Sequence, residues 1–273
     1  MSDAAADSSM FDILKAAIAA EEPVALATIV GLDGETGSLA MGAKVLVRPD
    51  HDTLGSLGND DLDRVVIRDT RGELAAGTTG IRHYGPNGEA RQEEVAVFVE
   101  SFAPPPRMLI FGAVDFTAAL SRVAKVLGYR VTVCDARPVF ATTQRFPWAD
   151  EVVVDWPHRL LEKVGPELTP RDAICVLTHD PKFDVPAVIA ALQTDAGYLG
   201  AMGSRRTTDD RNRRLREEGV ADEQLATIKA PIGLDLGART PEETAISICA
   251  EIIALRSGRT AQSLANTSGD IHT

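Results

Sequence analysis

Residues 107–135 read RMLIFGAVDFTAALSRVAKVLGYRVTVCD, and this stretch decides the fold of the second half of the chain. The apolar run 108–111 predicts a buried strand, residues 116–127 predict a helix, and residues 131–134 predict a second strand. Gly112 lies in the tight turn between the first strand and the helix. A strand, a helix and a strand in this order are typical of two parallel strands joined by a crossover helix.

The same alternation continues toward the C-terminus. Further strands are predicted at 151–155, 173–177 and 197–202, with helices at 159–164, 184–192 and 209–218 and a partly helical connection at 139–146. The last helix begins at a capping box, in which Thr240 is the N-cap and Glu243 the N3 residue. Short apolar strands alternating with helices predict an α/β domain with a Rossmann-type, doubly wound parallel sheet.

Pro104, Pro105 and Pro106 mark the domain boundary, because consecutive prolines favour a stiff extended linker. Before them, strands at 24–30, 43–48, 78–84 and 94–102 and helices at 10–20 and 60–71 predict a smaller α+β domain. We therefore expect an N-terminal domain at 1–103, a linker at 104–106, a Rossmann-type domain at 107–260 and a tail at 261–273.

Composition narrows the class of protein. The net charge of −12 over 273 residues argues against nucleic-acid binding, which requires a basic face. No uncharged run is long enough to span a bilayer, and the N-terminus lacks the basic start of a secretory signal. Cys134, Cys175 and Cys249 each lie in an apolar run, which predicts buried thiols. Their odd and sparse number fits a reducing, cytoplasmic location. The five histidines are scattered, so no metal site is predicted.

The turn after the first strand matches a dinucleotide fingerprint only in part. Gly112 fits the first glycine, but Val114 occupies the second position, where a Cβ hinders the approach of a pyrophosphate. Asp135 lies 23 residues after Gly112, where an acid would meet a ribose hydroxyl, or where it would simply cap a turn before Pro138. An NAD(P)-dependent oxidoreductase therefore stays an alternative.

Two later strand ends carry better candidates for a binding site. Thr178, His179 and Asp180 follow the fourth strand and should face residues 112–115, since ligands of open α/β sheets bind where the strand order reverses. His179 beside an Asp could serve as an acid, a base or a hydrogen-bond donor. The alternative is that Asp180 or Thr178 caps the next helix and that His179 is merely exposed.

Residues 203–206 read GSRR and lie between the fifth strand and a helix. A glycine, a serine, two arginines and a helix N-terminus together favour a phosphate. The alternative is a solvated basic loop. The loop 231–238 is punctuated by Gly233 and Gly237, which suggests a backbone close to a ligand or to another loop.

These motifs together resemble the XdhC/CoxI family of accessory proteins for xanthine dehydrogenase and related molybdenum hydroxylases. The resemblance rests on THD at 178–180 followed by Asp184, on GYLGAMGSRR at 197–206 and on APIGLDLGARTPEETAISICAEI at 230–252. Family members usually read GAGHxA at the first turn, where this chain has Val114 and Asp115, and carry an N-terminal GGCxE segment that this chain lacks at 58–63.

The resemblance implies a chaperone without turnover activity that binds the molybdenum cofactor, a pterin with a phosphate. It further implies cooperation with a cysteine desulfurase that installs a sulfido ligand, delivery to a hydroxylase of the xanthine dehydrogenase or CO dehydrogenase type, and a homodimer. A non-catalytic interaction protein with a degraded pocket is a further alternative. The predicted cofactor site comprises Gly112, Asp115, Asp135, Thr178, His179, Asp180, Gly203, Ser204, Arg205, Arg206 and Gly233.

Overall fold

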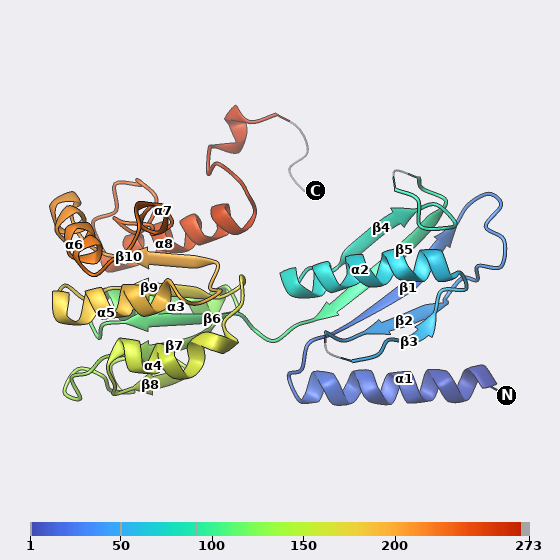
Figure 1. Cartoon of the computed structure of the whole chain (residues 1–273), viewed down its shortest axis with the longest axis horizontal. Helices are drawn as coiled ribbons and strands as arrows, with labels where there is room; N and C mark the ends of the chain where they lie inside the picture. The colour runs from blue at the N-terminus through green and yellow to red at the C-terminus, as the bar shows by residue number, and fades with distance from the viewer. Residues whose placement is uncertain (1, 50, 91, 269–273) are drawn as a thin grey trace. The chain divides into compact units, whose positions relative to one another are not determined.

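The computed structural model describes residues 2–49, 51–90 and 92–268 and divides the chain into two compact units, Met1–Pro104 and Pro105–Thr273 (Figure 1). In the described part of the chain, each unit is built on one five-stranded sheet. The predicted tail at 261–273 holds a short 3₁₀ turn, η2 (Leu264–Asn266), and its last five residues lie outside the described ranges.

The N-terminal unit is an antiparallel sheet with one helix on each face. Its elements are α1 (Ser2–Ala19), β1 (Val24–Leu32), β2 (Lys44–Val47), β3 (Leu54–Ser56), α2 (Asp60–Ala76), β4 (Gly80–Tyr84) and β5 (Val95–Phe102), with the strands in the order β3-β2-β1-β5-β4. Val45 and Val97 pack with Leu62 of α2, whereas Leu46 packs with Met10 of α1. Because neighbouring side chains on a strand point to opposite faces, both faces of this sheet are covered.

The C-terminal unit alternates strands and helices, except that turns connect β7 to β8. Its elements are β6 (Arg107–Phe111), α3 (Asp115–Val126), β7 (Arg130–Cys134), β8 (Glu151–Val153), α4 (Pro157–Val164), η1 (Gly165–Glu167), β9 (Ala173–Val176), α5 (Pro181–Ala191), β10 (Tyr198–Ala201), α6 (Arg205–Glu217), α7 (Asp222–Leu225) and α8 (Pro241–Arg256).

All strands of this second sheet are parallel and lie in the order β10-β9-β6-β7-β8. The chain therefore runs outward from β6 in one direction and, after β8, returns to continue from β9 in the other. This is the Rossmann strand order, with its reversal between β6 and β9. The predicted α/β fold, a doubly wound parallel sheet preceded by a smaller α+β domain, is confirmed, and the structure shows that the sheet of the smaller domain is antiparallel.

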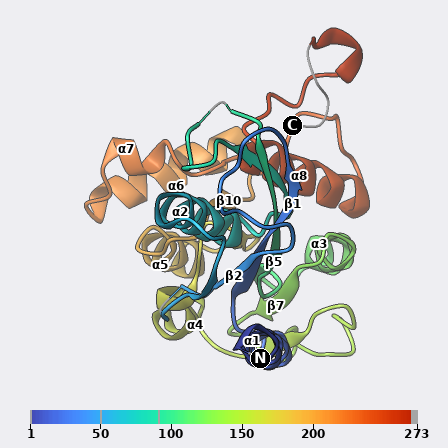
Figure 2. The same cartoon turned by 90° about the vertical axis from the view of Figure 1, so that its right-hand side faces the viewer.

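Helices cover both faces of the parallel sheet. Met108 and Ile110 pack with α3 and α8, whereas Leu109 and Phe111 pack with α4 and α5. Figure 2 shows α3 and α8 on one side of this sheet and α4, α5 and α6 on the other. The strands are consequently buried on both faces, and their continuous apolar sequences follow from this.

Some local predictions were wrong. Residues 139–146 form turns instead of a partly helical connection, and β3 lies in a stretch where no strand was predicted. Helix α1 begins earlier, and α2 ends later, than the sequence pattern predicts. The three cysteines are buried and free, as expected.

Candidate functional site

The carboxyl ends of β6 and β9 meet through Gly112 and Thr178. Gly112 adopts φ +113°, and a Cβ added there would lie 2.9 Å from Thr178 Cγ2 and 3.0 Å from its backbone nitrogen. Only glycine avoids both the backbone strain and this clash. The expected juxtaposition of the first turn with the segment after the fourth strand is thus present, at the reversal point where open α/β sheets bind ligands.

The three residues after β9 have different environments. Thr178 is buried, and its hydroxyl has no hydrogen-bond partner within the described residues. His179 is exposed. Asp180 is the N-cap of α5, where its carboxylate accepts from the Lys182 backbone N–H and pairs with the Lys182 ammonium at 3.3 Å. Capping by Asp180 and exposure of His179, left open by the sequence, are therefore both observed.

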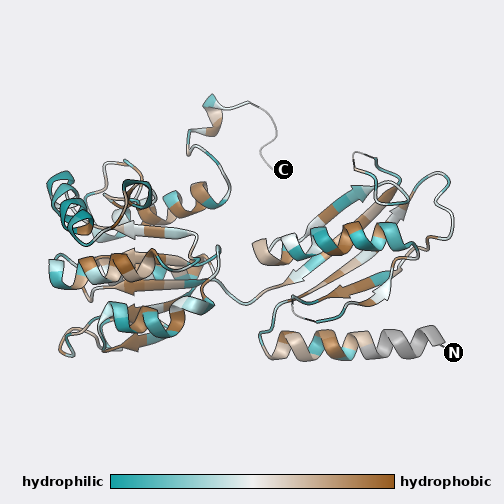
Figure 3. Ribbon diagram, in the orientation of Figure 1, coloured by the Kyte–Doolittle hydropathy of each residue, from teal (hydrophilic) through white to brown (hydrophobic). Residues whose placement is uncertain are grey.

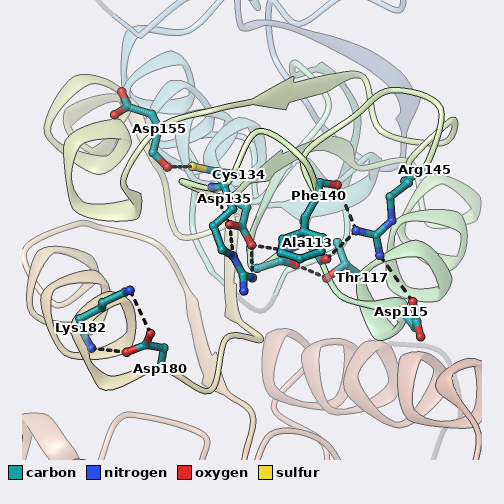
Figure 4. A network of polar contacts seen from close by, with 12 residues as sticks. Ala113, Asp115, Thr117, Cys134, Asp135, Phe140, Arg145, Asp155, Asp180 and Lys182 are labelled. Carbon is teal, nitrogen blue, oxygen red and sulfur yellow. Dashed lines mark hydrogen bonds and ion pairs between the residues drawn. The ribbon is translucent and has the colours of Figure 1, made fainter.

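Asp135 ties the end of β7 to the turn after β6 (Figure 4). Its carboxylate is buried and accepts from the Ala113 backbone N–H at 2.8 Å. It also accepts from the Arg137 backbone N–H and, through both oxygens, from the Arg137 guanidinium. Burial raises the pKa of Asp135, but these hydrogen bonds outweigh it and hold the pKa below its ordinary value.

The hydrogen bonds between Asp135 and Arg137 argue against the alternative of an NAD(P)-dependent oxidoreductase. Both oxygens of Asp135 are engaged within the protein, so a ribose hydroxyl would have to displace Arg137 to reach them. Arg137 is itself stacked on Phe140, with its guanidinium carbon 4.6 Å from the ring centroid. Together with the Cβ of Val114, this arrangement disfavours a dinucleotide in the usual position.

A second arginine braces the start of α3 (Figure 4). Arg145 donates to the Ala113 carbonyl at 3.1 Å and to the Phe140 carbonyl at 3.2 Å, and pairs with Asp115 at 3.5 Å. The Asp115 side chain is 90% exposed, so it lies at the surface beside the turn rather than inside it. Arg137 and Arg145 were not predicted, because the turns between β7 and β8 were expected to be partly helical.

Residues 203–206 lie at the N-terminus of α6 and include two exposed arginines. Ser204 caps α6 by accepting from the Thr207 backbone N–H. Gly203 has φ +152°, and a Cβ there would lie 3.0 Å from Thr207. Arg205 and Arg206 are exposed and form no ion pair with any residue that the structure describes. The helix N-terminus and both guanidinium groups are consequently available to an anion.

Gly233 is explained by packing against α8. It adopts φ +95°, its N–H donates to Glu251 at 3.0 Å, and a Cβ there would lie 2.5 Å from the Ser247 hydroxyl. The close neighbour of this loop is thus the last helix, and the assignment of Gly233 to a cofactor site stays a prediction.

Sequence reasoning missed a pocket between α5 and α6. The cavity measures about 210 Å³ and joins two predicted site residues, His179 and Arg206, with the buried residues Asp184 and Arg211. A signal was present: Thr208, Arg211 and Leu215 share helical spacing, which places an arginine on the buried face of α6. Most of α6 is hydrophilic, as its teal colour in Figure 3 shows.

Neither a metal centre nor a membrane span is found in the described part of the chain. Its residues contain no group of three or more His, Cys, Asp or Glu side chains placed to hold a metal ion. Within the same residues, no helix has the length and apolar character that a membrane crossing requires.

The family models that match this chain cover both of its units. A family model described as the XdhC Rossmann domain matches residues 108–252, and one described as the XdhC and CoxI family matches residues 17–85. A crystal structure described as a xanthine dehydrogenase from Bacillus halodurans aligns with a TM-score of 0.51 at 21% identity, covering 93% of this chain and 98% of that one. At this identity the alignment supports the fold alone.

Curated relatives are longer than this chain. A Bacillus subtilis protein named as a probable xanthine dehydrogenase subunit is 32% identical over 59% of this chain and 46% of that protein. The uncharacterized protein YqeB of Escherichia coli is 29% identical over 86% and 44%. The molybdenum cofactor insertion chaperone PaoD of Escherichia coli is 28% identical over 58% and 43%. The chain thus spans less than half the length of these relatives.

Proposed function

The chain belongs to the XdhC and CoxI family, and from this premise we propose that it binds the molybdenum cofactor and assists its insertion into a molybdenum hydroxylase. The observation that carries the proposal is the start of α6, where Arg205 and Arg206 are exposed and uncommitted beside Ser204 and Gly203. A helix N-terminus with two free guanidinium groups suits the terminal phosphate of a pterin cofactor.

The position of this segment supports the same function. It follows β10, next to β9 at the carboxyl edge of the sheet, and Met202 donates its N–H to the Val176 carbonyl at 2.8 Å. Thr178 and His179 follow β9 at that edge, so one ligand would contact both segments. The names of two relatives, a molybdenum cofactor insertion chaperone and part of a probable xanthine dehydrogenase, agree with this proposal.

We further propose that the protein acts with partners rather than as a turnover enzyme. A cysteine desulfurase would supply the sulfido ligand, and a xanthine dehydrogenase-type or CO dehydrogenase-type hydroxylase would receive the cofactor, with the chaperone acting as a homodimer. Pull-downs of the purified chain with each protein, with and without cofactor, test these contacts. Binding of a hydroxylase or desulfurase without any retention of cofactor would instead favour a pure interaction protein.

Direct cofactor binding is the central test. The full-length protein is mixed with cofactor freshly released from a molybdoenzyme and passed through a desalting column, and the retained molybdenum and pterin are measured. We expect near-stoichiometric retention by the unmodified chain and at least about tenfold weaker binding by Arg205→Ala with Arg206→Ala, since two charge-assisted hydrogen bonds are lost.

A charge-matched control is available on the same helix. Arg213 and Arg216 are exposed but already paired with acidic residues, at 3.0 Å to Asp210 and 2.8 Å to Asp222. Arg213→Ala with Arg216→Ala removes the same charge and should leave retention unchanged. Retention of neither molybdenum nor pterin by the unmodified chain would overturn the proposal.

A further inference from the structure

A buried ion pair lines the pocket between α5 and α6. Asp184 and Arg211 form an ion pair at 3.3 Å, and their side chains are only 5% and 3% exposed. Arg211 Nη2 also donates to the Met202 carbonyl. Burial raises the pKa of Asp184 to about 6, although the Arg211 charge opposes this rise. Both groups thus lie away from solvent in a pocket that opens to it.

Several polar atoms at this ion pair lack partners. Within the described residues, Asp184 Oδ1, Arg211 Nε and Arg211 Nη1 are buried and make no hydrogen bond, and neither does the neighbouring Thr208 hydroxyl. Buried polar groups are nearly always hydrogen-bonded, and a buried ion pair is favourable only when its remaining donors and acceptors are satisfied. Asp184 and Arg211 both line the pocket, so a ligand bound there is the candidate partner for these two donors and one acceptor.

The mixture of donor and acceptor restricts the ligand class. A fully deprotonated anion would satisfy Arg211 but would meet the Asp184 carboxylate oxygen, with which it cannot form a hydrogen bond. A ligand that presents an N–H donor next to a carbonyl acceptor satisfies both side chains. A 2-amino-4-oxopyrimidine edge has this pattern, and pterins and guanine share it.

On the basis of the function proposed above, we propose that the Asp184–Arg211 pocket recognises the amino-lactam edge of a pterin ring. Asp184 accepts from the 2-amino group, and Arg211 donates to the ring carbonyl oxygen. The exposed charged residues that line the same pocket are Arg206, Arg214 and Asp210, so they carry a net positive charge, which suits a ring that carries a phosphate elsewhere. The two predicted segments that contain His179 and Arg206 would then both line the binding site of one pterin ring.

Two fluorescent probes test this assignment without any substitution. Pterin carries the 2-amino group, whereas lumazine carries a carbonyl there, so lumazine keeps the ring N–H but lacks the amino donor that Asp184 is proposed to accept from. We expect the full-length protein to bind pterin at least about tenfold more tightly than lumazine, since one hydrogen bond to a charged group is at stake. Equal binding of the two, or no binding of pterin, would overturn the proposal.

Competition experiments distinguish a pterin from a guanine nucleotide as the ligand that presents this edge. Guanosine monophosphate should displace pterin and adenosine monophosphate should not. Tighter binding of pterin than of guanosine monophosphate assigns the pocket to the cofactor, and the reverse order assigns it to a guanine nucleotide. Displacement of pterin by inorganic phosphate at similar affinity would show an anion site and contradict edge recognition.

Variants add a second line of evidence. Asp184→Asn should weaken pterin at least about tenfold while leaving lumazine little changed, which a general structural role would not produce. Asp209→Asn, an exposed change of equal charge on α6 outside the pocket, is the control. If the protein retains molybdenum but binds pterin and lumazine equally, only the assignment of the pocket to the pterin edge is contradicted. If it prefers pterin to lumazine but retains no molybdenum, only the proposed function is contradicted.

Discussion

The Asp135 carboxylate accepts two hydrogen bonds from the Arg137 guanidinium, at 2.9 Å from Nε and 2.8 Å from Nη2, and at the same time holds the Ala113 backbone N–H. One side chain thus fixes the turn after β6 relative to the end of β7. Asp135 is 3% exposed, so solvent screens these bonds only weakly.

Replacing Asp135 by Asn should destabilise the fold in a pH-dependent way. The lost charge-assisted bonds predict a decrease of about 2 kcal/mol in the free energy of unfolding at pH 7. Because the pKa of Asp135 is lowered in the folded state, its contribution is present above the unfolded value of about 3.9 and is lost as the pH falls through the folded pKa. Urea unfolding at pH 7 and pH 3 measures this.

The control for this prediction is Asp115→Asn. Asp115 is 90% exposed and pairs loosely with Arg145, so its replacement should change the stability by less than about 0.5 kcal/mol. A destabilisation by Asp135→Asn that persists undiminished at pH 3 would show that shape, not charge, holds the turn.

Gly112→Ala should disrupt the meeting of β6 and β9. The new Cβ would strain a backbone at φ +113° and press on Thr178, at a predicted cost of roughly 2–4 kcal/mol. Gly128→Ala is the matched control, because Gly128 has φ +81° but nothing within 4 Å of an added Cβ, so backbone strain alone costs about 1 kcal/mol. Thermal melts compare the two, and equal losses would exclude a role for the Thr178 contact.

Nicotinamide binding should be absent even when the fingerprint is repaired. Val114→Gly restores the second glycine, but Asp135 stays engaged with Arg137. We expect neither the unmodified chain nor Val114→Gly to enhance NADH fluorescence at concentrations up to about 1 mM, a typical weak-binding limit. Tight NADH binding by either form would revive an oxidoreductase.

Pterin binding should depend on pH through Asp184. Its pKa is raised to about 6 by burial, so the carboxylate that accepts from the 2-amino group is present above this pH and lost below it. We expect binding to be about tenfold weaker at pH 5 than at pH 7. A flat profile in fluorescence titrations, or the same profile in Asp184→Asn, would contradict this prediction.

The cysteines should be unreactive in the folded protein. Burial raises the pKa of the Cys134 and Cys249 thiols to about 12 and that of Cys175 well above its ordinary value, so little thiolate forms near neutral pH. A thiol reagent at pH 8 should modify none of the three in the native state and all three in guanidinium chloride. Rapid native modification of any one would reveal an opening that the structure does not contain.

The fold could be predicted because its signal is repeated along the chain. Every strand of the second unit except β7 is a short apolar run followed by a helix, and the strand order places Gly112 against Thr178 by topology alone. The Arg137 and Arg145 bracing could not be predicted, since it depends on turns at 139–146 that have no periodic pattern. The Asp184–Arg211 pair was missed for a related reason: two charged residues become partners only when α5 packs on α6.

The contact between Gly112 and Thr178 also has a consequence for biosynthesis. The two residues stand on adjacent strands, yet β7, β8 and α4 lie between them in sequence, so the contact forms only after a long loop has closed. A chain that is still emerging from the ribosome has a first turn but no opposing wall. A ligand of the proposed site between these two strands can therefore be bound only after β9 has paired with β6.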